Sequence, residues 1–386
     1  MIYKKFNKTA FSLIELSIVV LIIGILIAGI SQSSRLIKAM KLSTARSLTR
    51  SSDVNSINNL TAWFDATAEG VLSSSCDTVV NGVASTFSTS LATTPRTEGN
   101  VAKRTINYNQ PEHRDIVRLW KDSSPQNTES AKIILEYTEP YSGSTGTCST
   151  TAFPDSNNGP MYHNSAINGL PAIYFQERSA PIPLMRANYL TSLDKENMPI
   201  KSGKKQFSIF LVFRNDKLIG WPGIFQISSN NFPSDDDRTT LTMYPSWGGC
   251  GTSPSLSWNM GSGRGNCSSA IYFSDPNKYN LSNSLSGVYA AGFAIDYENL
   301  NNNKLYLNSS NNPTSTSGSN ITASNSLNLN ASQLAIGGGY AFNGTQHSLP
   351  FPGYVSEVII FDRTLIKEEA SSVMNYLIKK YNIKEL

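Results

Sequence analysis

Histidine, cysteine and paired acidic residues are scarce in this sequence of 386 residues. The three histidines, His113, His163 and His347, stand far apart in loop-like stretches, and nothing suggests a Ser/His/Asp catalytic site. Glycoside hydrolysis needs two facing carboxylates, but the E-x-D-x-x-E pattern, which would place them on one strand, is absent. The nearest pair, Asp296 and Glu298, alternates onto one face of a predicted strand and flanks a turn, where solvated acids are ordinary. We therefore expect a protein that is not an enzyme.

Cysteine is limited to Cys76, Cys148, Cys250 and Cys267, and none has the C-x-x-C spacing typical of zinc sites. Four cysteines can pair in three ways, and proximity in the sequence favours Cys250–Cys267 with Cys76–Cys148. An even number of cysteines in a domain rich in Ser, Thr and Asn, behind an apolar helix, indicates an oxidising compartment. The domain is therefore expected in the periplasm or at the cell surface.

One uninterrupted apolar stretch runs from Phe11 to Ile30 and contains a single charge, Glu15. As a helix with ~1.5 Å of rise per residue, a stretch of this length spans the ~30 Å hydrocarbon core of a bilayer. A carboxylate near the end of such a helix is expensive to bury, so Glu15 is expected to have a functional partner. Gly24 and Ala28 form a small-xxx-small pair, which lets two helices approach closely.

The start of this stretch carries a specific motif. A short leader with three lysines ends in the small residue Ala10, and the letters F-S-L-I-E open the helix from Phe11 to Glu15. The arrangement resembles the type IV prepilin signature, a basic leader and a small residue followed by F-[ST]-L-x-E. Most of that family has Gly before the cleavage site, and we expect Ala10 to lower the efficiency of cleavage without abolishing it.

The prepilin resemblance implies a processing route and an assembly role. A prepilin peptidase would cut between Ala10 and Phe11, and the new amino group of Phe11 would be N-methylated. Glu15 would then pair with the N-terminal ammonium of a neighbouring subunit as helices stack into a filament. Such a pairing is physically coherent, because two buried opposite charges are tolerable only when each satisfies the other.

Two other interpretations of the N-terminus compete with the prepilin interpretation. A secretory signal peptide has an apolar region of ~7–15 residues and a small-x-small cleavage site, for which Gly29 and Ser31 are weak candidates. The apolar run here is longer and contains an acid. An ordinary signal anchor fits the length but gives no reason for Glu15. The prepilin interpretation accounts for both the length and the acid.

The same helix is expected to continue out of the membrane. From Ser31 to about Asn59 the chain is polar, has no proline and carries apolar residues at loosely helical spacing. This part is basic, but no aromatic residues interleave with its charges, which argues against nucleic acid as a partner. The expected organisation is a leader at 1–10, a pilin-type helix at 11–59 with its transmembrane part at 11–30, and a separate domain at 60–386.

Beyond Leu60, helical periodicity gives way to short alternating runs between Gly, Asn, Ser and Pro clusters, which is typical of an all-β sandwich or barrel. The predicted strands are Gln206–Arg214, Gly223–Ser228, Thr239–Tyr244, Ser255–Asn259, Ala270–Phe273, Val288–Tyr297, Lys304–Asn308, Gln333–Ile336 and Gly353–Phe361. The sixth and seventh are expected to form a hairpin across an Asn-rich turn. The predicted fold class is mainly β: a long N-terminal membrane-spanning α-helix, then a large antiparallel β-sandwich (jelly roll) with a short C-terminal helix.

Several short motifs in this region carry a second resemblance. They are LTAWFDA at 60–66, LWKDS at 119–123, NGLPAIYF at 168–175, FSIFLVF at 207–213 and the run from Gly353 to Tyr381. Together they resemble the concanavalin A-like, laminin G-like jelly rolls of bacterial surface proteins. The last run predicts a strand, a turn and a helix starting near Ile366. The members of one face of this helix are Val373, Tyr376, Leu377 and Tyr381.

Domains of this kind often bind sugars through aromatic platforms and a calcium ion. Trp221 and Trp247 lie in Gly/Pro-rich loops and are the candidate platforms for carbohydrate, whereas Trp63, Trp120 and Trp258 lie in strand-like motifs and are expected in the core. The densest group of potential oxygen ligands is Asn230, Asn231, Asp235, Asp236 and Asp237. Calcium at the three aspartates is one interpretation of that group, and a solvated acidic loop is the commoner one.

These features together predict a minor pilin or pseudopilin that presents a lectin-like domain outside the cytoplasm for adhesion. It would be held in the bacterial inner membrane by one span before assembly. Its expected partners are other pilin subunits, the prepilin peptidase, the inner membrane and carbohydrate. The alternatives are a structural pseudopilin of a type II secretion system and a membrane-anchored glycan hydrolase. A chain from about Asn59 onward is expected to fold alone, since the membrane helix contributes nothing to the core of the sandwich.

Overall fold

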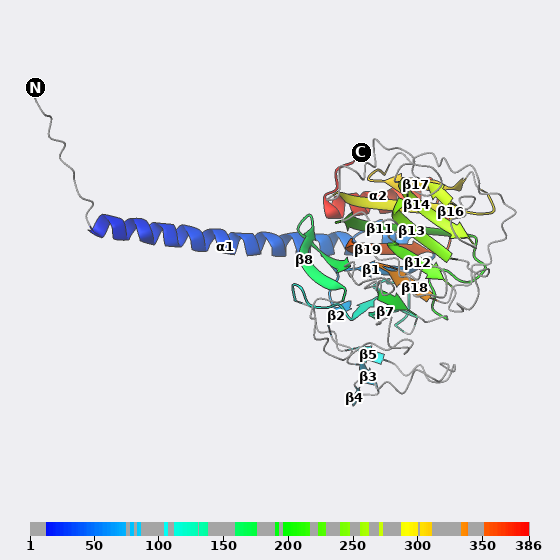
Figure 1. Ribbon diagram of the computed structural model, residues 1–386, viewed down its shortest axis with the longest axis horizontal. Coiled ribbons are helices and arrows are strands. Elements are labelled where there is room, and N and C mark those ends of the chain that lie inside the picture. The colour runs from blue at the N-terminus through cyan, green and yellow to red at the C-terminus, as the bar shows by residue number, and fades with distance from the viewer. Residues whose placement is uncertain are drawn as a thin grey trace, which may run out of the picture.

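The computed structural model shows one long helix that projects from a β-rich head (Figure 1). The described residues are 13–74, 78–80, 83–85, 104–106, 112–129, 131–137, 159–175, 190–192, 196–216, 223–228, 240–247, 255–261, 270–272, 287–299, 302–310, 333–338 and 351–385. Within them the fold is mainly β, with a long apolar N-terminal helix, two large antiparallel sheets and a short C-terminal helix. The predicted fold class is therefore confirmed.

Helix α1 spans Leu13–Arg50 and ends earlier than the sequence predicts. The expected end at about Asn59 is wrong, because polar side chains after Arg50 compete for the last helical carbonyls. The side-chain amide of Asn55 donates to the carbonyl oxygens of Thr49 at 3.1 Å and Arg50 at 3.3 Å. Ser52 Oγ also donates to Thr49 O, at 3.0 Å. The chain then forms a short 3-10 helix, η1, at Asp53–Ser56.

Two large sheets make up the body of the head. The central sheet has the order β17 (Lys304–Leu307), β16 (Val288–Asp296), β11 (Gln206–Asn215), β19 (Gly353–Phe361), β9 (Leu170–Phe175) and β8 (Met161–Ile167). Strand β1 (Leu60–Asp65) also belongs to it and pairs with the C-terminal half of β19, while β9 pairs with the N-terminal half. Strand β19 thus lies between β11 on one side and both β1 and β9 on the other.

The outer sheet packs across one face of the central sheet. Its order is β15 (Ala270–Tyr272), β14 (Ser255–Gly261), β13 (Thr240–Trp247), β12 (Phe225–Ser228), β18 (Gln333–Ile336), β10 (Leu190–Ser192), β7 (Ile134–Tyr137), β6 (Leu119–Lys121) and β2 (Leu72–Ser73). A small third sheet contains β4 (Val83–Ser85), β3 (Thr78–Val80) and β5 (Arg104–Ile106). All of these pairings are antiparallel.

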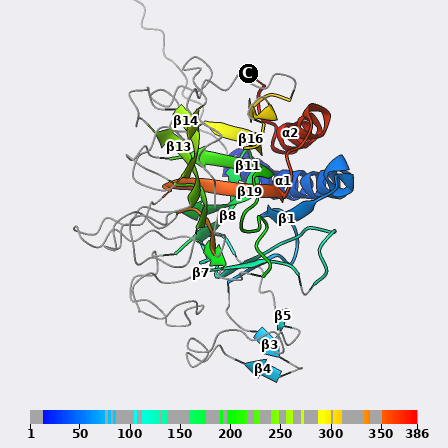
Figure 2. The same ribbon diagram turned by 90° about the vertical axis from the view of Figure 1, so that its right-hand side faces the viewer.

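Figure 2 shows three layers: the helices, the central sheet and the outer sheet. The first core lies between the two sheets and contains Trp120, whose ring meets Phe64 edge to face at 5.6 Å. The second core lies between the other face of the central sheet and the helices. Because the central sheet is covered on both faces, its long strands are mostly apolar, and every residue of β19 is buried.

Helix α2 spans Lys367–Tyr381 and covers the second core together with the end of α1. Its predicted start near Ile366 is confirmed, and so is its predicted apolar face, whose four members are buried. The second core also contains Ala45, Val54 and Ile57, which precede β1 in the chain. The apolar core of the head therefore begins before Asn59, and the last turns of α1 contribute to it.

All the strands predicted from the sequence are present, with ends that differ by a few residues at most. The predicted hairpin is β16 paired with β17. Trp63 and Trp120 are core residues as expected, at 1% and 0% exposed. Trp258 lies on β14, but its side chain is outside the described residues.

Candidate functional site

The N-terminal part of α1, residues 13–40, stands clear of the head and is here called the stalk (Figure 1). Its large apolar side chains are all at least 48% exposed. They are Leu13, Ile14, Leu16, Ile18, Val19, Val20, Leu21, Ile22, Ile23, Ile25, Leu26, Ile27, Ile30, Leu36, Ile37 and Met40. The stalk is long and apolar enough to cross a membrane, judged by length and composition. An apolar surface of this size indicates contact with lipid or with other proteins.

The predicted assembly residues lie along the stalk. Glu15 is in the first turn of α1, where a carboxylate interacts favourably with the positive end of the helix dipole. Gly24 and Ala28 are four residues apart and so share a face. A Cβ atom added at Gly24 would meet nothing within 4 Å, which leaves that face open to a neighbouring helix. Ala10 and Phe11 lie outside the described residues, so the cleavage site stays a prediction.

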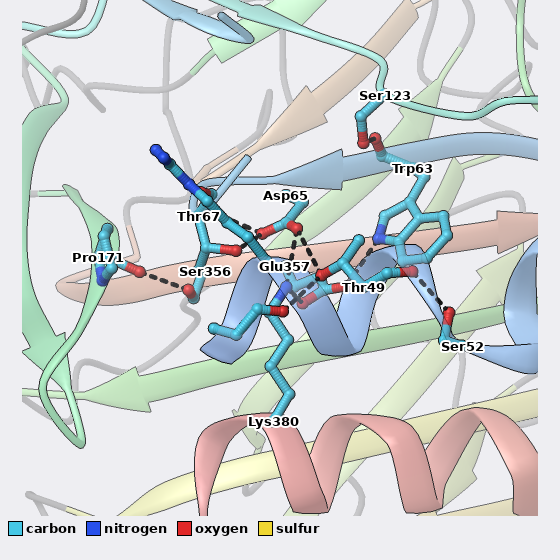
Figure 3. Close-up of polar contacts among 12 residues, drawn as sticks. Thr49, Ser52, Trp63, Asp65, Thr67, Ser123, Pro171, Ser356, Glu357 and Lys380 are labelled. Carbon is cyan, nitrogen blue, oxygen red and sulfur yellow. Dashed lines mark hydrogen bonds and ion pairs between the residues drawn. The ribbon is translucent and has the colours of Figure 1, made fainter. Parts of the chain in front are cut away.

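The end of α1 joins the head at a buried polar cluster, here called the junction (Figure 3). At its centre, Lys380 Nζ lies 2.7 Å from Asp65 Oδ2 and 2.7 Å from Glu357 Oε2. The side chains of all three residues are 0% exposed. The ammonium also donates to the hydroxyl of Tyr376 at 3.0 Å, so its three protons have three acceptors.

Glu357 accepts hydrogen bonds on both carboxylate oxygens. Oε1 accepts from Trp63 Nε1 at 2.6 Å and from the hydroxyl of Tyr376 at 2.7 Å. Oε2 accepts from Lys380 and, at 2.9 Å, from the hydroxyl of Tyr381. Burial raises the pKa of Glu357, and Lys380 opposes that rise. Burial, followed by the charge of Glu357, also raises the pKa of both tyrosines well above the usual value, so they remain hydrogen-bond donors.

Asp65 is held from two sides. Its Oδ1 accepts from the backbone N–H of Thr67 at 2.8 Å and from the Thr67 hydroxyl at 2.7 Å. Its Oδ2 accepts from Lys380 and from Thr49 Oγ1, the latter at 3.2 Å. Thr49 lies in the last turn of α1 and its hydroxyl is also 2.9 Å from that of Tyr376. The junction therefore ties α1 to β1, β19 and α2 through hydrogen bonds and ion pairs.

Local structure explains why these side chains meet. Asp65 and Glu357 are direct partners in the β1–β19 register, so they lie next to one another in the sheet. Tyr376 and Lys380 are four residues apart on α2 and share the face that packs on this sheet. The ring of Trp63 meets that of Tyr376 edge to face at 5.7 Å. Sequence reasoning missed the cluster, although a charged residue inside the apolar run of β19 was a visible signal.

A second group of polar and aromatic residues, here called the aromatic patch, lies on the helix-facing side of the central sheet. Arg214, Tyr354 and Tyr174 are register partners on β11, β19 and β9. The Arg214 guanidinium lies 4.1 Å from the centre of the Tyr354 ring, and the two tyrosine rings are 4.7 Å apart. His163 on β8 completes the patch, with its ring 5.2 Å from Tyr354 and 5.6 Å from Tyr174.

The expectation that the histidines stand far apart is wrong for His113 and His163, and the expectation of a loop setting is wrong for His163 alone, since His113 lies in a turn. His163 is on strand β8, and its ring lies 5.0 Å from that of His113. Pairing of β8 with its neighbours brings together residues that are distant in sequence. Burial lowers the pKa of His163 to about 4, and the positive charges of His113, Arg114 and Arg214 add to the effect. Its Nε2 is buried and has no hydrogen-bond partner among the described residues.

Asp296 and Glu298 behave differently from one another. The expectation of a solvated acid holds for Glu298, whose side chain is 61% exposed. It is wrong for Asp296, which is 3% exposed and accepts from the backbone N–H groups of Glu298 at 2.9 Å and Asn299 at 3.0 Å. Asp296 therefore closes the β16–β17 turn.

Most of the other predicted site residues lie outside the described residues and stay predictions. They are Cys76, Cys148, Cys250, Cys267, Trp221, Asp235, Asp236 and Asp237. Trp247 ends strand β13, but its side chain is outside the description. Among the described residues, no group of three or more His, Cys, Asp or Glu side chains could hold a metal ion.

No protein-family model matches the sequence, and no curated protein matches it either. Among solved structures, the chain is similar to the binding domain of botulinum neurotoxin DC in complex with rat synaptotagmin II, at 15% identity and a TM-score of 0.38 over 67% of this chain and 49% of that one. It is also similar to a Trypanosoma rangeli sialidase in complex with 2,3-difluorosialic acid, at 10% identity and a TM-score of 0.37 over 89% of this chain and 38% of that one. The chain thus spans less than half the length of either. Likeness at this level carries no argument about activity or ligands.

Proposed function

We propose that this protein is a minor pilin or pseudopilin, which packs its stalk among the helices of other subunits and presents the head at the filament surface or tip. The observation that carries this proposal is the contrast within α1. Residues 13–40 expose apolar side chains, while Ala45 and Thr49 are fixed in the head. A helix that was only a tether would not need a rigid, buried attachment.

The motif from Ala10 to Glu15 supports the same proposal, because it resembles the prepilin signature at the start of this helix. On this proposal, the stalk holds the subunit in the inner membrane before assembly, with its head in the periplasm. The interior of a filament then replaces lipid around the stalk. The head is large for a shaft made only of this chain, so it caps or decorates a filament of other pilins.

Mass spectrometry of the mature protein tests the processing step. The expected N-terminus is N-methylated Phe11, and Ala10→Asp is expected to leave the precursor uncut. Ala10→Gly is the matched control, since it restores the residue most common in the family and should be cut at least as well. A mature start near Ser31, or an intact Met1, would refute the pilin proposal.

The assembly step is tested separately with Glu15. Glu15→Val should be cleaved normally but should enter filaments poorly, because the ammonium of a neighbouring subunit loses its counter-charge. Glu15→Asp keeps the charge and is expected to retain part of the assembly. Equal incorporation of Glu15→Val and the wild type into sheared filaments would contradict the proposed role.

A second candidate function, binding of carbohydrate by the head, is favoured by the aromatic patch. Aromatic rings stack on the apolar faces of sugars, and a nearby guanidinium donates hydrogen bonds to hydroxyl or carboxylate groups. Tyr174 and Arg214 are only partly buried. The guanidinium already donates to Ala166 O at 2.6 Å and to Asp216 Oδ1 at 3.2 Å, so a sugar would contact the Tyr174 ring and the remaining edge of Arg214. The predicted platforms Trp221 and Trp247 would be a second location for the same activity.

Glycan-array binding by the purified protein tests this activity and locates it. Tyr174→Ala should weaken binding without unfolding the head if the aromatic patch is the site. Trp221→Ala and Trp247→Ala should do so if the predicted loops are the site. No binding on broad arrays, together with co-purification of the full chain with other pilins, would favour the structural pseudopilin of a secretion system. Release of sugar from an array would instead support the alternative function of a membrane-anchored glycan hydrolase.

A further inference from the structure

The junction places an amine and a carboxyl group in contact where no solvent reaches them. We propose that Lys380 and Asp65 condense to an intramolecular amide bond, with Glu357 as the group that carries the protons. The amine Nζ and the acceptor Oδ2 are 2.7 Å apart, and the three side chains concerned are 0% exposed. Two groups held in contact react as if at a very high concentration, which lowers the barrier to their condensation.

Asp65 is arranged as the electrophile of this reaction. Attack of an amine on its carboxyl carbon moves negative charge onto an oxygen, and fixed donors stabilise that charge most effectively when water is excluded. Oδ1 already has two such donors, the backbone N–H and the hydroxyl of Thr67, at 2.8 and 2.7 Å. Oδ2 faces Lys380 and Thr49 and is therefore the oxygen that leaves.

Glu357 is arranged as the proton carrier. Its Oε2 accepts from Lys380 Nζ at 2.7 Å, so it can take a proton from the ammonium and leave a nucleophilic amine. Its Oε1 is linked to the leaving oxygen by two hydroxyl groups. The hydroxyl of Tyr376 lies 2.7 Å from Oε1 and 2.9 Å from Thr49 Oγ1, which in turn lies 3.2 Å from Asp65 Oδ2. A carboxyl group whose pKa is raised by burial is well suited to hold a proton between these steps.

The reaction balances without any further reactant. The Lys380 ammonium gives one proton to Glu357, and the free electron pair of Nζ attacks the carboxyl carbon of Asp65. The new C–N bond forms, Nζ gives up a second proton, and the bond from the carbon to Oδ2 breaks. Both protons leave with that oxygen as one molecule of water, and Glu357 returns to its starting state. An ammonium and a carboxylate have become an amide.

Two features of the junction favour the amide over the ion pair. Condensation removes two charges from a site without solvent, where each ion carries a desolvation penalty. The site also admits no bulk water to reverse the reaction. Glu357 is assigned the proton-carrying role because the hydroxyls of Tyr376 and Thr49 link its Oε1 to Asp65 Oδ2, the oxygen that leaves. The bond is thus assigned to Asp65, 315 residues away from Lys380 in sequence.

Peptide mass spectrometry of the purified, folded full chain tests the proposal. After reduction and digestion, the peptide that contains Asp65 should be joined to the one that contains Lys380, at the sum of their masses less one water. Fragmentation should place the link on these two residues. Recovery of the two peptides separately, with both side chains unmodified, would overturn the proposal. A link from Lys380 to Glu357 would overturn the assignment of Asp65.

Variants separate the chemistry from the fold. Lys380→Arg keeps a cation but cannot form the amide, and the joined peptide should be lost completely. Lys379→Arg is the matched control, because Lys379 is exposed on the same helix, and the joined peptide should persist. Glu357→Gln should lower the joined fraction at least tenfold in protein whose circular dichroism matches the wild type. A folded Glu357→Gln protein that is fully joined would refute the role of Glu357 as proton carrier.

Discussion

Substitution of Thr49 by valine removes one hydroxyl from the junction without changing charge and with little change in shape. In the wild type that hydroxyl lies 3.2 Å from Asp65 Oδ2 and 2.9 Å from the hydroxyl of Tyr376. Thr49→Val leaves both partners buried with one hydrogen bond fewer. It breaks the polar link between α1 and the rest of the cluster but leaves Lys380 with its acceptors.

The size of the effect follows from those contacts. Leaving a buried polar group without a partner costs about 1–3 kcal/mol. In the ion-paired form that the structure shows, neither partner is fully orphaned, because Asp65 Oδ2 still accepts from Lys380 and the Tyr376 hydroxyl still contacts Glu357. We therefore expect the free energy of unfolding to fall by about 1–2 kcal/mol, toward the low end of that range. For a chain of this size the melting temperature should fall by about 1–3 °C.

The assay compares thermal unfolding of the wild type, Thr49→Val and Thr49→Ser in chains that begin at Ser34, beyond the most apolar part of the stalk. Serine keeps the hydroxyl, so Thr49→Ser should lose less stability than Thr49→Val. Hydrogen exchange of the amides from Ser47 to Arg50 should be faster in Thr49→Val, because the last turn of α1 opens more easily. Equal melting temperatures and exchange rates for Thr49→Val and the wild type would refute the idea that this hydroxyl fastens the helix.

Three further predictions concern other parts of the head. The pKa of His163 is about 4 in the folded protein, below the ordinary value of 6.5, so the unfolded chain binds the proton more tightly. The contribution of His163 to stability is therefore present above pH 6.5 and is lost as the pH falls toward 4. The melting temperature of His163→Phe should therefore fall less than that of the wild type between pH 6.5 and pH 4. Parallel curves of melting temperature against pH for the two proteins would contradict this. A chain that begins at Asn59 should unfold at a lower urea concentration than one that begins at Lys41, because it lacks part of the second core. Equal urea midpoints would show that residues 41–58 contribute nothing to stability. Reduction of the cysteines should lower the melting temperature if they form two disulfides, since each disulfide contributes roughly 2–4 kcal/mol to the free energy of unfolding. An unchanged melting temperature would argue for free thiols.

The sequence predicted those parts of the fold that depend on local pattern. The strands from β11 to β19 and helix α2 could be placed because apolar periodicity and turn residues mark them. The end of α1 was missed because Asn55 and Ser52 act through side-chain hydrogen bonds to specific carbonyls, which a count of apolar positions does not register.

The junction could not be predicted from the sequence for a different reason. Asp65, Glu357 and Lys380 are ordinary charged residues in their own segments, and only the β1–β19 register and the packing of α2 bring them together. The approach of His113 to His163 likewise depends on strand pairing. The local sequence pattern predicts helices and strands. Which polar side chains are buried together depends instead on contacts between helices and strands that are distant in sequence.

The position of β19 in the central sheet determines when the head can fold. Strand β1 is synthesised long before its pairing partner β19, since Thr61 Oγ1 bonds to Ile360 O across 299 residues. At about 5–20 residues per second, synthesis of that interval takes roughly 15–60 s. Throughout that time, the edge of β1 and the apolar surfaces that β19 will cover have no native partner. A stalk that enters the membrane early would keep each unfinished head separated from its neighbours, so that the edges of different chains meet less often before β19 arrives.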